Sequence, residues 1–142
     1  MIKLKHILKE VIEENSIQNI VDRVYPQIVK DLGGQMKPVE VHDNIYERLG
    51  AVAVEDLMKQ NNPDAQFDPE DDKIYIYSSK MRTVEDVIRS LLHEHTHTLQ
   101  DQKEFSQLYA DGALYDNHLF EQAAKKAEEN WEKYVWEYLA SG

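Results

Sequence analysis

The sequence of 142 residues predicts an α+β domain in which a small sheet packs beside helices. Apolar residues recur at intervals of three and four over residues 83–100 and 118–139, which indicates two amphipathic helices. Residues 65–77 have the alternation and the turn residues of a β-hairpin. A chain of this length has room for one modest core. We therefore expect a single domain, 1–142, with N-terminal helices in 1–34, a small sheet region with a helix in 37–82 and further helices in 83–142.

The N-terminal part is predicted to contain two helices and a short strand. Apolar residues have helical spacing over 7–12 and 17–32; Pro26 predicts a kink or a break, and Gly33-Gly34 predicts a helix end. Val39–His42 alternates as a short strand does. Residues 44–62 favour a helix, and a strand over 50–54 is an alternative.

The hairpin is predicted to lead directly into a long helix. Its turn, 68–72, is rich in aspartate and proline, and Ile74–Tyr77 is β-branched and aromatic. We expect these strands to form a small antiparallel sheet. Thr83 is a typical N-cap, and acids follow it in the first turn of the helix 83–100. Residues 101–117 are the least regular stretch before the last helix, 118–139.

The composition excludes several functional classes. Lys and Arg total 16 against 27 Asp and Glu, giving a net charge of −11, so we expect no nucleic-acid partner. The absence of cysteine excludes thiolate metal sites and thiol nucleophiles. No apolar run is long enough for a membrane span, and the charged N-terminus lacks the pattern of a secretory signal, so we expect a cytoplasmic protein. No feature predicts an oligomeric state.

The strongest motif lies within the helix 83–100. His93-Glu94-His95-Thr96-His97 fits the H-E-x-x-H pattern. Residues four apart share one helix face, so His93 and His97 can bind a single ion, and zinc favours such nitrogen ligands. Glu94 is placed to accept a proton from water at the metal without being a ligand itself. His95 falls on the apolar stripe and is predicted to be a hydrogen-bonded core residue.

A third metal ligand must come from elsewhere in the chain. A metzincin would carry glycine and histidine where this sequence has Gln100 and Lys103, which excludes that class. Glu121, which borders the apolar face of the last helix, is the predicted ligand; its alternative is an exposed carboxylate near a helix start. Glu128 is either an acceptor for a ligand imidazole or a solvated charge. Rival third ligands are Asp101, Asp111, Asp116 and His118.

With these pieces the chain resembles the gluzincin branch of the zincin metallopeptidases, and most of all the small minigluzincins. The resemblance covers roughly residues 65–130: the hairpin, the motif helix and the later helix with Glu121. It implies a zincin-like fold, one Zn²⁺ per chain and a peptide or protein substrate. It also implies hydrolysis by a zinc-activated water with Glu94 as general base. Family members use the strand before the motif helix as a substrate-binding edge, which here implies an edge strand formed by Ile74, Tyr75, Ile76 and Tyr77.

The sequence also departs from this family. Lys125 stands where many gluzincins carry an acid, and no local motif identifies the residue that stabilises the oxyanion; the candidates are Tyr109, Tyr115 and His118. The chain start resembles that of some tailed-phage proteins, which would place the protein in a host cytoplasm or a virion. Two other functions stay open: a catalytically silent metal-binding module of a larger assembly, and a metal-free helical adaptor. In a chain this small we expect a shallow, open cleft.

Overall fold

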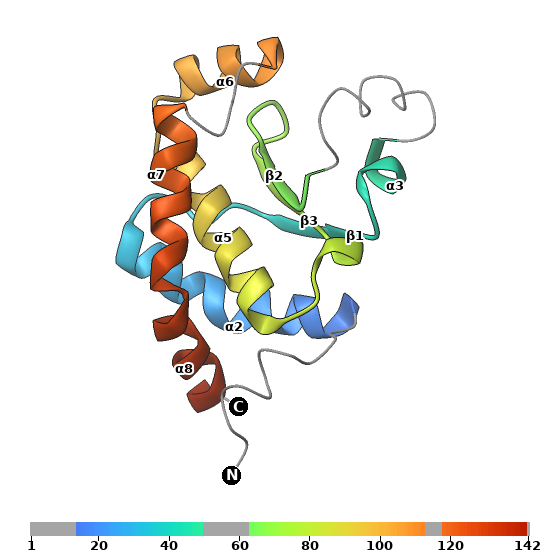
Figure 1. The fold of residues 1–142 in the computed structure, drawn as a ribbon, viewed down its shortest axis with the longest axis vertical. Helices are drawn as coiled ribbons and strands as arrows, with labels where there is room; N and C mark the ends of the chain where they lie inside the picture. Colours follow the sequence, from blue (N-terminus) through green and yellow to red (C-terminus); the bar gives the residue numbers. More distant parts are fainter. Residues whose placement is uncertain (1–13, 50–62, 113–117, 142) are drawn as a thin grey trace.

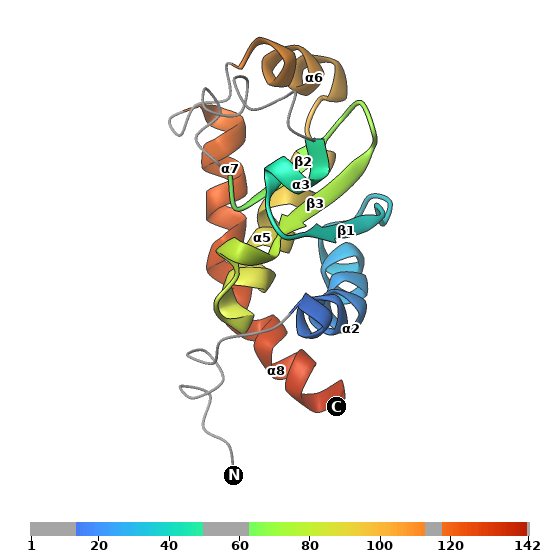
Figure 2. The ribbon, with the colours of Figure 1, turned by 90° about the vertical axis from the view of Figure 1, so that its right-hand side faces the viewer.

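The computed structural model describes residues 14–49, 63–112 and 118–141 and has an α+β architecture. The predicted helix 7–12, and most of the ambiguous segment 44–62, lie outside these residues. The helix α5 (Val84–Thr98) lies at the centre, and it contacts the sheet as well as α2 (Glu14–Leu32), α7 (Leu119–Ala127) and α8 (Trp131–Ser141). Figures 1 and 2 show the sheet on one side of α5 and the α7–α8 pair on another.

The sheet has three strands in the order β1-β3-β2. β2 (Ala65–Asp68) and β3 (Lys73–Tyr77) form the predicted antiparallel hairpin. β1 (Val39–His42) is also present as predicted, but it pairs with β3 in parallel, from Val39 opposite Ile74 to His42 opposite Tyr77. The expectation of an antiparallel sheet was therefore wrong, and the sheet is mixed.

This topology also corrects the prediction that residues 74–77 form an exposed edge. β3 is the central strand, with hydrogen-bonded neighbours on both sides, so its main chain has no free edge for a peptide. Within the described residues, β1 and β2 are the edge strands. The prediction failed because the second partner of β3 comes from a distant short strand, whose pairing no local pattern indicates.

The core is formed where α2, α5 and the sheet meet. Apolar side chains one helical turn apart on α2 and α5 face each other beneath the inner face of β3, and each fully buried aliphatic side chain contributes roughly 1.5–3 kcal/mol to stability. Core residues that are at most 1% exposed include Ile17, Ile20, Val24, Ile28, Ile74, Ile76, Val87, Ile88, Leu91 and Leu92.

The helix α2 runs through Pro26 without interruption, so the predicted break is wrong. Proline removes one backbone donor, but buried residues on both sides, Val24 and Ile28, hold the helix against the core, and such packing outweighs local propensity. The helix ends where the glycines predict. Gly33 has φ +86°, and its N–H donates to the carbonyl of Val29 at 2.7 Å.

The N-terminus of α5 is fixed by a capping box. The amide of Asp86 donates to Thr83 Oγ1, and the amide of Thr83 donates to Asp86 Oδ2, both at 3.1 Å. The predicted helix start is therefore confirmed. This cap, together with the buried stripe, sets the rotation of α5 and so the face that carries the motif.

Two segments after α5 differ from the prediction. Residues expected to be irregular contain α6 (Gln102–Asp111), capped by Asp101, which accepts from the amide of Glu104 at 2.9 Å. The last helix is not continuous, because a 3-10 turn, η3 (Glu128–Asn130), separates α7 from α8. Two short helices, α3 (Ile45–Leu49) and η2 (Ser78–Lys80), complete the described elements. Of the helices described, none has both the length and the apolar character needed to cross a membrane.

Candidate metal centre

The two motif histidines lie one turn apart on α5 with their rings adjacent. The ring centroids of His93 and His97 are 4.9 Å apart. His93, Glu94 and His97 each offer a ligand atom within 4.8 Å of the others, so this group could hold a metal ion. His97 is only 2% exposed and Glu94 only 7%, so the group is largely shielded from solvent.

Glu121 joins this group from α7. Its Oε2 lies 3.1 Å from His93 Nε2, and its Oε1 lies 2.8 Å from His97 Nε2. The two helices contact each other, and Ala124, one turn after Glu121, is fully buried. One carboxylate from a separate helix thus meets the Nε2 atoms of both imidazoles, as the ligand prediction requires.

The rival third ligands that the structure describes have other contacts. Asp101 caps α6, and Asp111 accepts from the side-chain amide of Gln107 at 2.9 Å. His118 caps α7, where its Nδ1 accepts from the amide of Phe120 at 3.1 Å. Asp116 lies outside the described residues.

The cluster is strongly negative around the imidazole of His93. Burial disfavours the imidazolium, but the charges of Glu94, Glu121 and Glu128 outweigh it and raise the pKa of His93 to about 10. Burial disfavours the charged carboxylate of Glu121 and so acts to raise its pKa. Hydrogen bonds from His93 and His97 outweigh burial and hold the pKa of Glu121 well below its usual range. In the metal-free protein, a proton on His93 therefore supplies part of the positive charge that these carboxylates favour. A metal cation would supply more positive charge at the same place.

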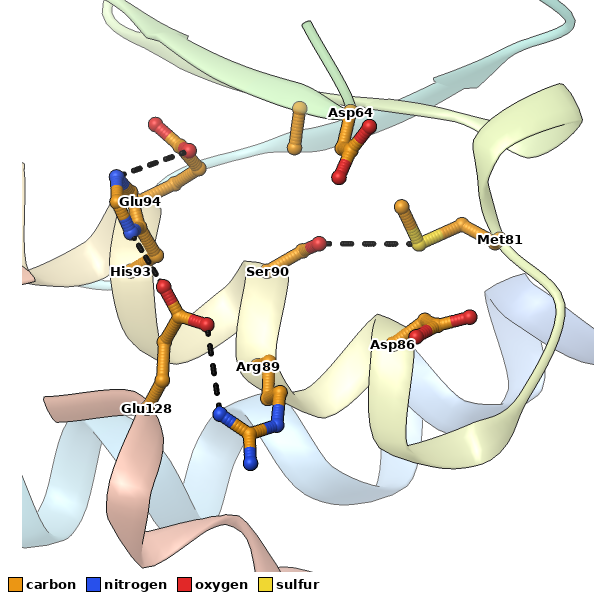
Figure 3. A pocket seen from close by; sticks show the side chains of 9 residues that line it. Asp64, Met81, Asp86, Arg89, Ser90, His93, Glu94 and Glu128 are labelled. Carbon is orange, nitrogen blue, oxygen red and sulfur yellow. Dashed lines mark hydrogen bonds and ion pairs between the residues drawn. The ribbon is translucent and has the colours of Figure 1, made fainter. Parts of the chain in front are cut away.

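Glu128 orients His93 from η3. The Nδ1–H of His93 donates to Glu128 Oε2 at 2.8 Å, and the other carboxylate oxygen lies 3.7 Å from Arg89 Nη1 (Figure 3). Of the two roles considered for Glu128, the structure shows the imidazole acceptor. This contact keeps a proton on Nδ1 and directs Nε2 towards Glu121, which is the arrangement that metal ligation needs.

Gln100 performs the same task for His97, and the sequence interpretation missed it. The Nδ1–H of His97 donates to Gln100 Oε1 at 2.7 Å, and Gln100 Nε2 donates to the carbonyl of Phe120 at 2.9 Å. Phe120 directly precedes Glu121, so one amide side chain links the end of α5 to α7. Its position about one turn after His97 was the only signal available in the sequence.

A second missed feature is the contact between the motif helix and β2. Glu94 Oε1 accepts the main-chain N–H of Phe67 at 2.9 Å, while its Oε2 lies 4.0 Å from His93 Nε2. The strand next to the candidate centre is therefore β2, not β3. An edge strand provides such a donor because every second N–H points away from its partner strand.

Two of the three oxyanion candidates, Tyr109 and His118, lie within the described residues, and neither is brought to Glu94. The ring of Tyr109 stacks on Phe105, which packs against His97, but its hydroxyl interacts with Arg48 near the end of β2. Burial, with the charge of Asp68 as the next cause, raises the pKa of Tyr109 to about 12. His118 has the capping role described above, and Tyr115 lies outside the described residues.

His95 is the core histidine that the sequence predicts. It is fully buried; its Nε2 donates to the carbonyl of Gly33 at 2.8 Å, and its Nδ1 accepts from the hydroxyl of Tyr25 at 2.9 Å. Burial lowers the pKa of His95, so the ring is held neutral. It ties the last turn of α5 to the end of α2 and is not one of the residues grouped around the candidate metal site.

A pocket of about 240 Å³ opens beside His93 and Glu94. Figure 3 shows it between the start of β2 and the outward face of α5, with Glu128 at one end. It is partly open to solvent. Comparisons of the chain with protein-family models, curated proteins and solved structures find no match to any of them.

Proposed function

We propose that the chain is a zinc-dependent metallopeptidase with a zincin-like fold of the gluzincin type. The observation that carries this proposal is the position of Glu121, whose carboxylate meets the Nε2 atoms of both motif histidines at 3.1 and 2.8 Å. The H-E-x-x-H pattern does not itself require a carboxylate from another helix at this point, so Glu121 is a separate observation in favour of a metal site.

The donor set fits zinc. Two imidazole nitrogens and one carboxylate oxygen are a common set in catalytic zinc sites, which keep their fourth position for water or substrate. Glu128 and Gln100 hold the two rings by their Nδ1 atoms, so both Nε2 atoms remain directed at one point. When bound, zinc lowers the pKa of a coordinated water and polarises a substrate carbonyl.

In this proposal Glu94 moves the proton. Its Oε1 is held by the N–H of Phe67, which leaves Oε2 to accept a proton from the attacking water. The same oxygen then delivers the proton to the departing amine. Glu94 is nearly buried, so bulk water competes little for that proton.

The peptide would lie along β2. This strand pairs only with β3 among the described residues, and its other edge adjoins Glu94. An extended substrate can add to such an edge through main-chain hydrogen bonds, which tolerate many sequences. β2 therefore replaces Ile74–Tyr77 as the proposed substrate strand.

Two measurements test the proposal. Elemental analysis is expected to find one zinc per chain, lost in His97→Ala and in Glu121→Ala. Casein hydrolysis is expected in the zinc-loaded protein and not in Glu94→Gln, which should retain the metal. Failure to take up zinc would overturn both parts of the proposal.

Two observations favour a second function, a metal-binding module without activity. The only described tyrosine among the oxyanion candidates, Tyr109, interacts with Arg48 instead of the cluster, and Lys125 replaces the usual acid. Full zinc occupancy without turnover of any peptide would support this alternative.

A further inference from the structure

The pocket beside His93 and Glu94 has a lining with an excess of carboxylates. Asp64, Asp86, Glu94 and Glu128 contribute negative charge, and Arg89 is the guanidinium among them. Arg89 is already engaged, because Glu85 lies 2.8 Å from its Nε and Glu128 lies 3.7 Å from its Nη1. The end of the pocket away from His93 therefore keeps uncompensated negative charge.

Two carboxylates define that end, and Figure 3 shows them on opposite sides of the space. Asp64 stands directly before β2, and its position is fixed because its carbonyl accepts the amide of Tyr77 at 3.1 Å. Its carboxylate has no hydrogen-bond or ion-pair partner in the described part of the chain. Asp86 uses Oδ2 to cap α5 through the amides of Arg82 and Thr83, at 2.9 and 3.1 Å.

The rest of the wall is apolar or weakly polar. Met81 and Ala65 are buried side chains, and Ser90 places its hydroxyl 3.7 Å from the sulfur of Met81. The volume of about 240 Å³ is below the 300–1,000 Å³ of pockets for drug-sized ligands, so it suits a single side chain. An aliphatic stem along Met81 and Ala65 with a cationic end near Asp64 and Asp86 matches this distribution.

A buried group at the other end connects the pocket to the chemistry. Glu94 is 7% exposed and lines the pocket, and its Oε2 makes no hydrogen bond among the described residues. A side chain bound in the pocket would therefore lie beside Glu94. Since Asp64 leads into β2, a peptide along that strand would pass the pocket mouth.

We propose that this pocket binds a lysine or arginine side chain next to the scissile bond. The assignment rests on the proposed function and names its substrate class as peptides with a basic residue at that position. A neutral apolar side chain would cover carboxylates without pairing them, and an acidic one would be repelled. The net charge of −11 attracts cationic peptides from a distance as well.

Binding to the metal-free protein tests the pocket independently of catalysis. The probes are Nα-acetyl-lysine methylamide and its norleucine counterpart, titrated while backbone amide NMR shifts are recorded. The lysine probe should shift the amides of Ala65 and Ser90 and bind about fivefold more tightly than norleucine. Asp64→Asn should remove this difference, whereas Glu132→Gln, an equal charge change on the exposed face of α8, should preserve it. Equal binding of the two probes, or shifts elsewhere, would overturn the assignment.

Cleavage of a peptide library by the zinc-loaded protein tests the link to catalysis. Lysine and arginine should be enriched about fivefold at one position flanking the cleaved bond, and Asp64→Asn should lose that enrichment. Cleavage without a charge preference would overturn the assignment but not the proposed function. Lysine-selective binding without any cleavage would reject the peptidase and keep the cationic pocket.

Discussion

The main-chain N–H of Phe67 donates to Glu94 Oε1 at 2.9 Å, which joins the edge of β2 to the acid of the H-E-x-x-H motif. Glu94 therefore has two separable roles, a structural one through Oε1 and the proposed proton transfer through Oε2. The donor belongs to the backbone, so no substitution of Phe67 other than proline removes it. Substitutions of Glu94 can separate the roles.

Glu94→Gln should abolish activity without loss of the fold. Glutamine keeps an oxygen for the N–H of Phe67 but cannot accept the proton, so peptide hydrolysis should fall by about 10²–10⁴-fold. Glu94→Ala should lose activity and also about 1–3 kcal/mol of unfolding free energy, because a buried N–H is left without an acceptor. Urea unfolding and zinc content, measured on both variants, distinguish them. Equal destabilisation by the two substitutions would contradict the structural role.

Gln100→Ala should weaken zinc binding about 10–100-fold. The substitution removes the acceptor of the His97 Nδ1–H and the donor to the carbonyl of Phe120, so both the ring and the start of α7 lose an anchor. Competition with a chelator measures the Kd. Gln107→Ala is the matched control, since Gln107 is an exposed glutamine on α6 whose side chain donates to the local Asp111. An unchanged Kd for Gln100→Ala would show that His97 is oriented by other contacts.

Zinc binding should release about one proton per chain at pH 8. In the metal-free protein the pKa of His93 is raised to about 10, so its ring is protonated at pH 8, whereas a metal ligand must be neutral. The apparent affinity should therefore rise with pH, up to tenfold per unit, until about pH 10. Calorimetry in two buffers with different ionisation enthalpies counts the protons. A heat that is independent of the buffer would mean that His93 is already neutral.

The raised pKa of His93 also makes the stability of the metal-free protein depend on pH. Because the folded-state value lies above the unfolded value of about 6.5, this contribution is complete below pH 6.5 and is lost as the pH rises towards 10. Bound zinc holds the ring of His93 neutral, so it should remove this dependence of stability on pH between about pH 6.5 and 10. Thermal unfolding at pH 6 and pH 9.5, with and without zinc, measures both effects.

The parts of the fold that local patterns specify could be predicted. α5 has a cap, a first turn of acids and a continuous buried stripe, and the motif inherits its geometry from that helix. Glu121 could be selected because it borders an apolar face whose small Ala124 permits close contact with α5. In both cases sequence spacing alone decides which side chains share a face.

The missed features depend on contacts between distant segments or on weak patterns. The pairing of β1 with β3 joins residues 35 apart in the chain, from Val39 to Ile74, and no local signal encodes it. α6 buries only Phe105, so it lacks an apolar stripe, and its helix is indicated only by the cap at Asp101 and by Gly112. The bond from Phe67 to Glu94 is made by main-chain atoms, which carry no residue-specific signal.

His95 should give the protein a dependence on pH that differs from that of the metal cluster. Burial lowers its folded-state pKa, so its contribution to stability is complete above the unfolded value of about 6.5 and is lost as the pH falls below it. The cause is burial, which disfavours the imidazolium, and the charge of Lys37 adds to it. Metal-free His95→Gln should be less stable than the parent at pH 7.5, and the difference should shrink at pH 5. Tyr25→Phe keeps the imidazole and should retain the parent's loss of stability on acidification. Urea unfolding at both pH values measures these stabilities. An equal loss of stability on acidification in the parent and in His95→Gln would assign the acid sensitivity to other groups.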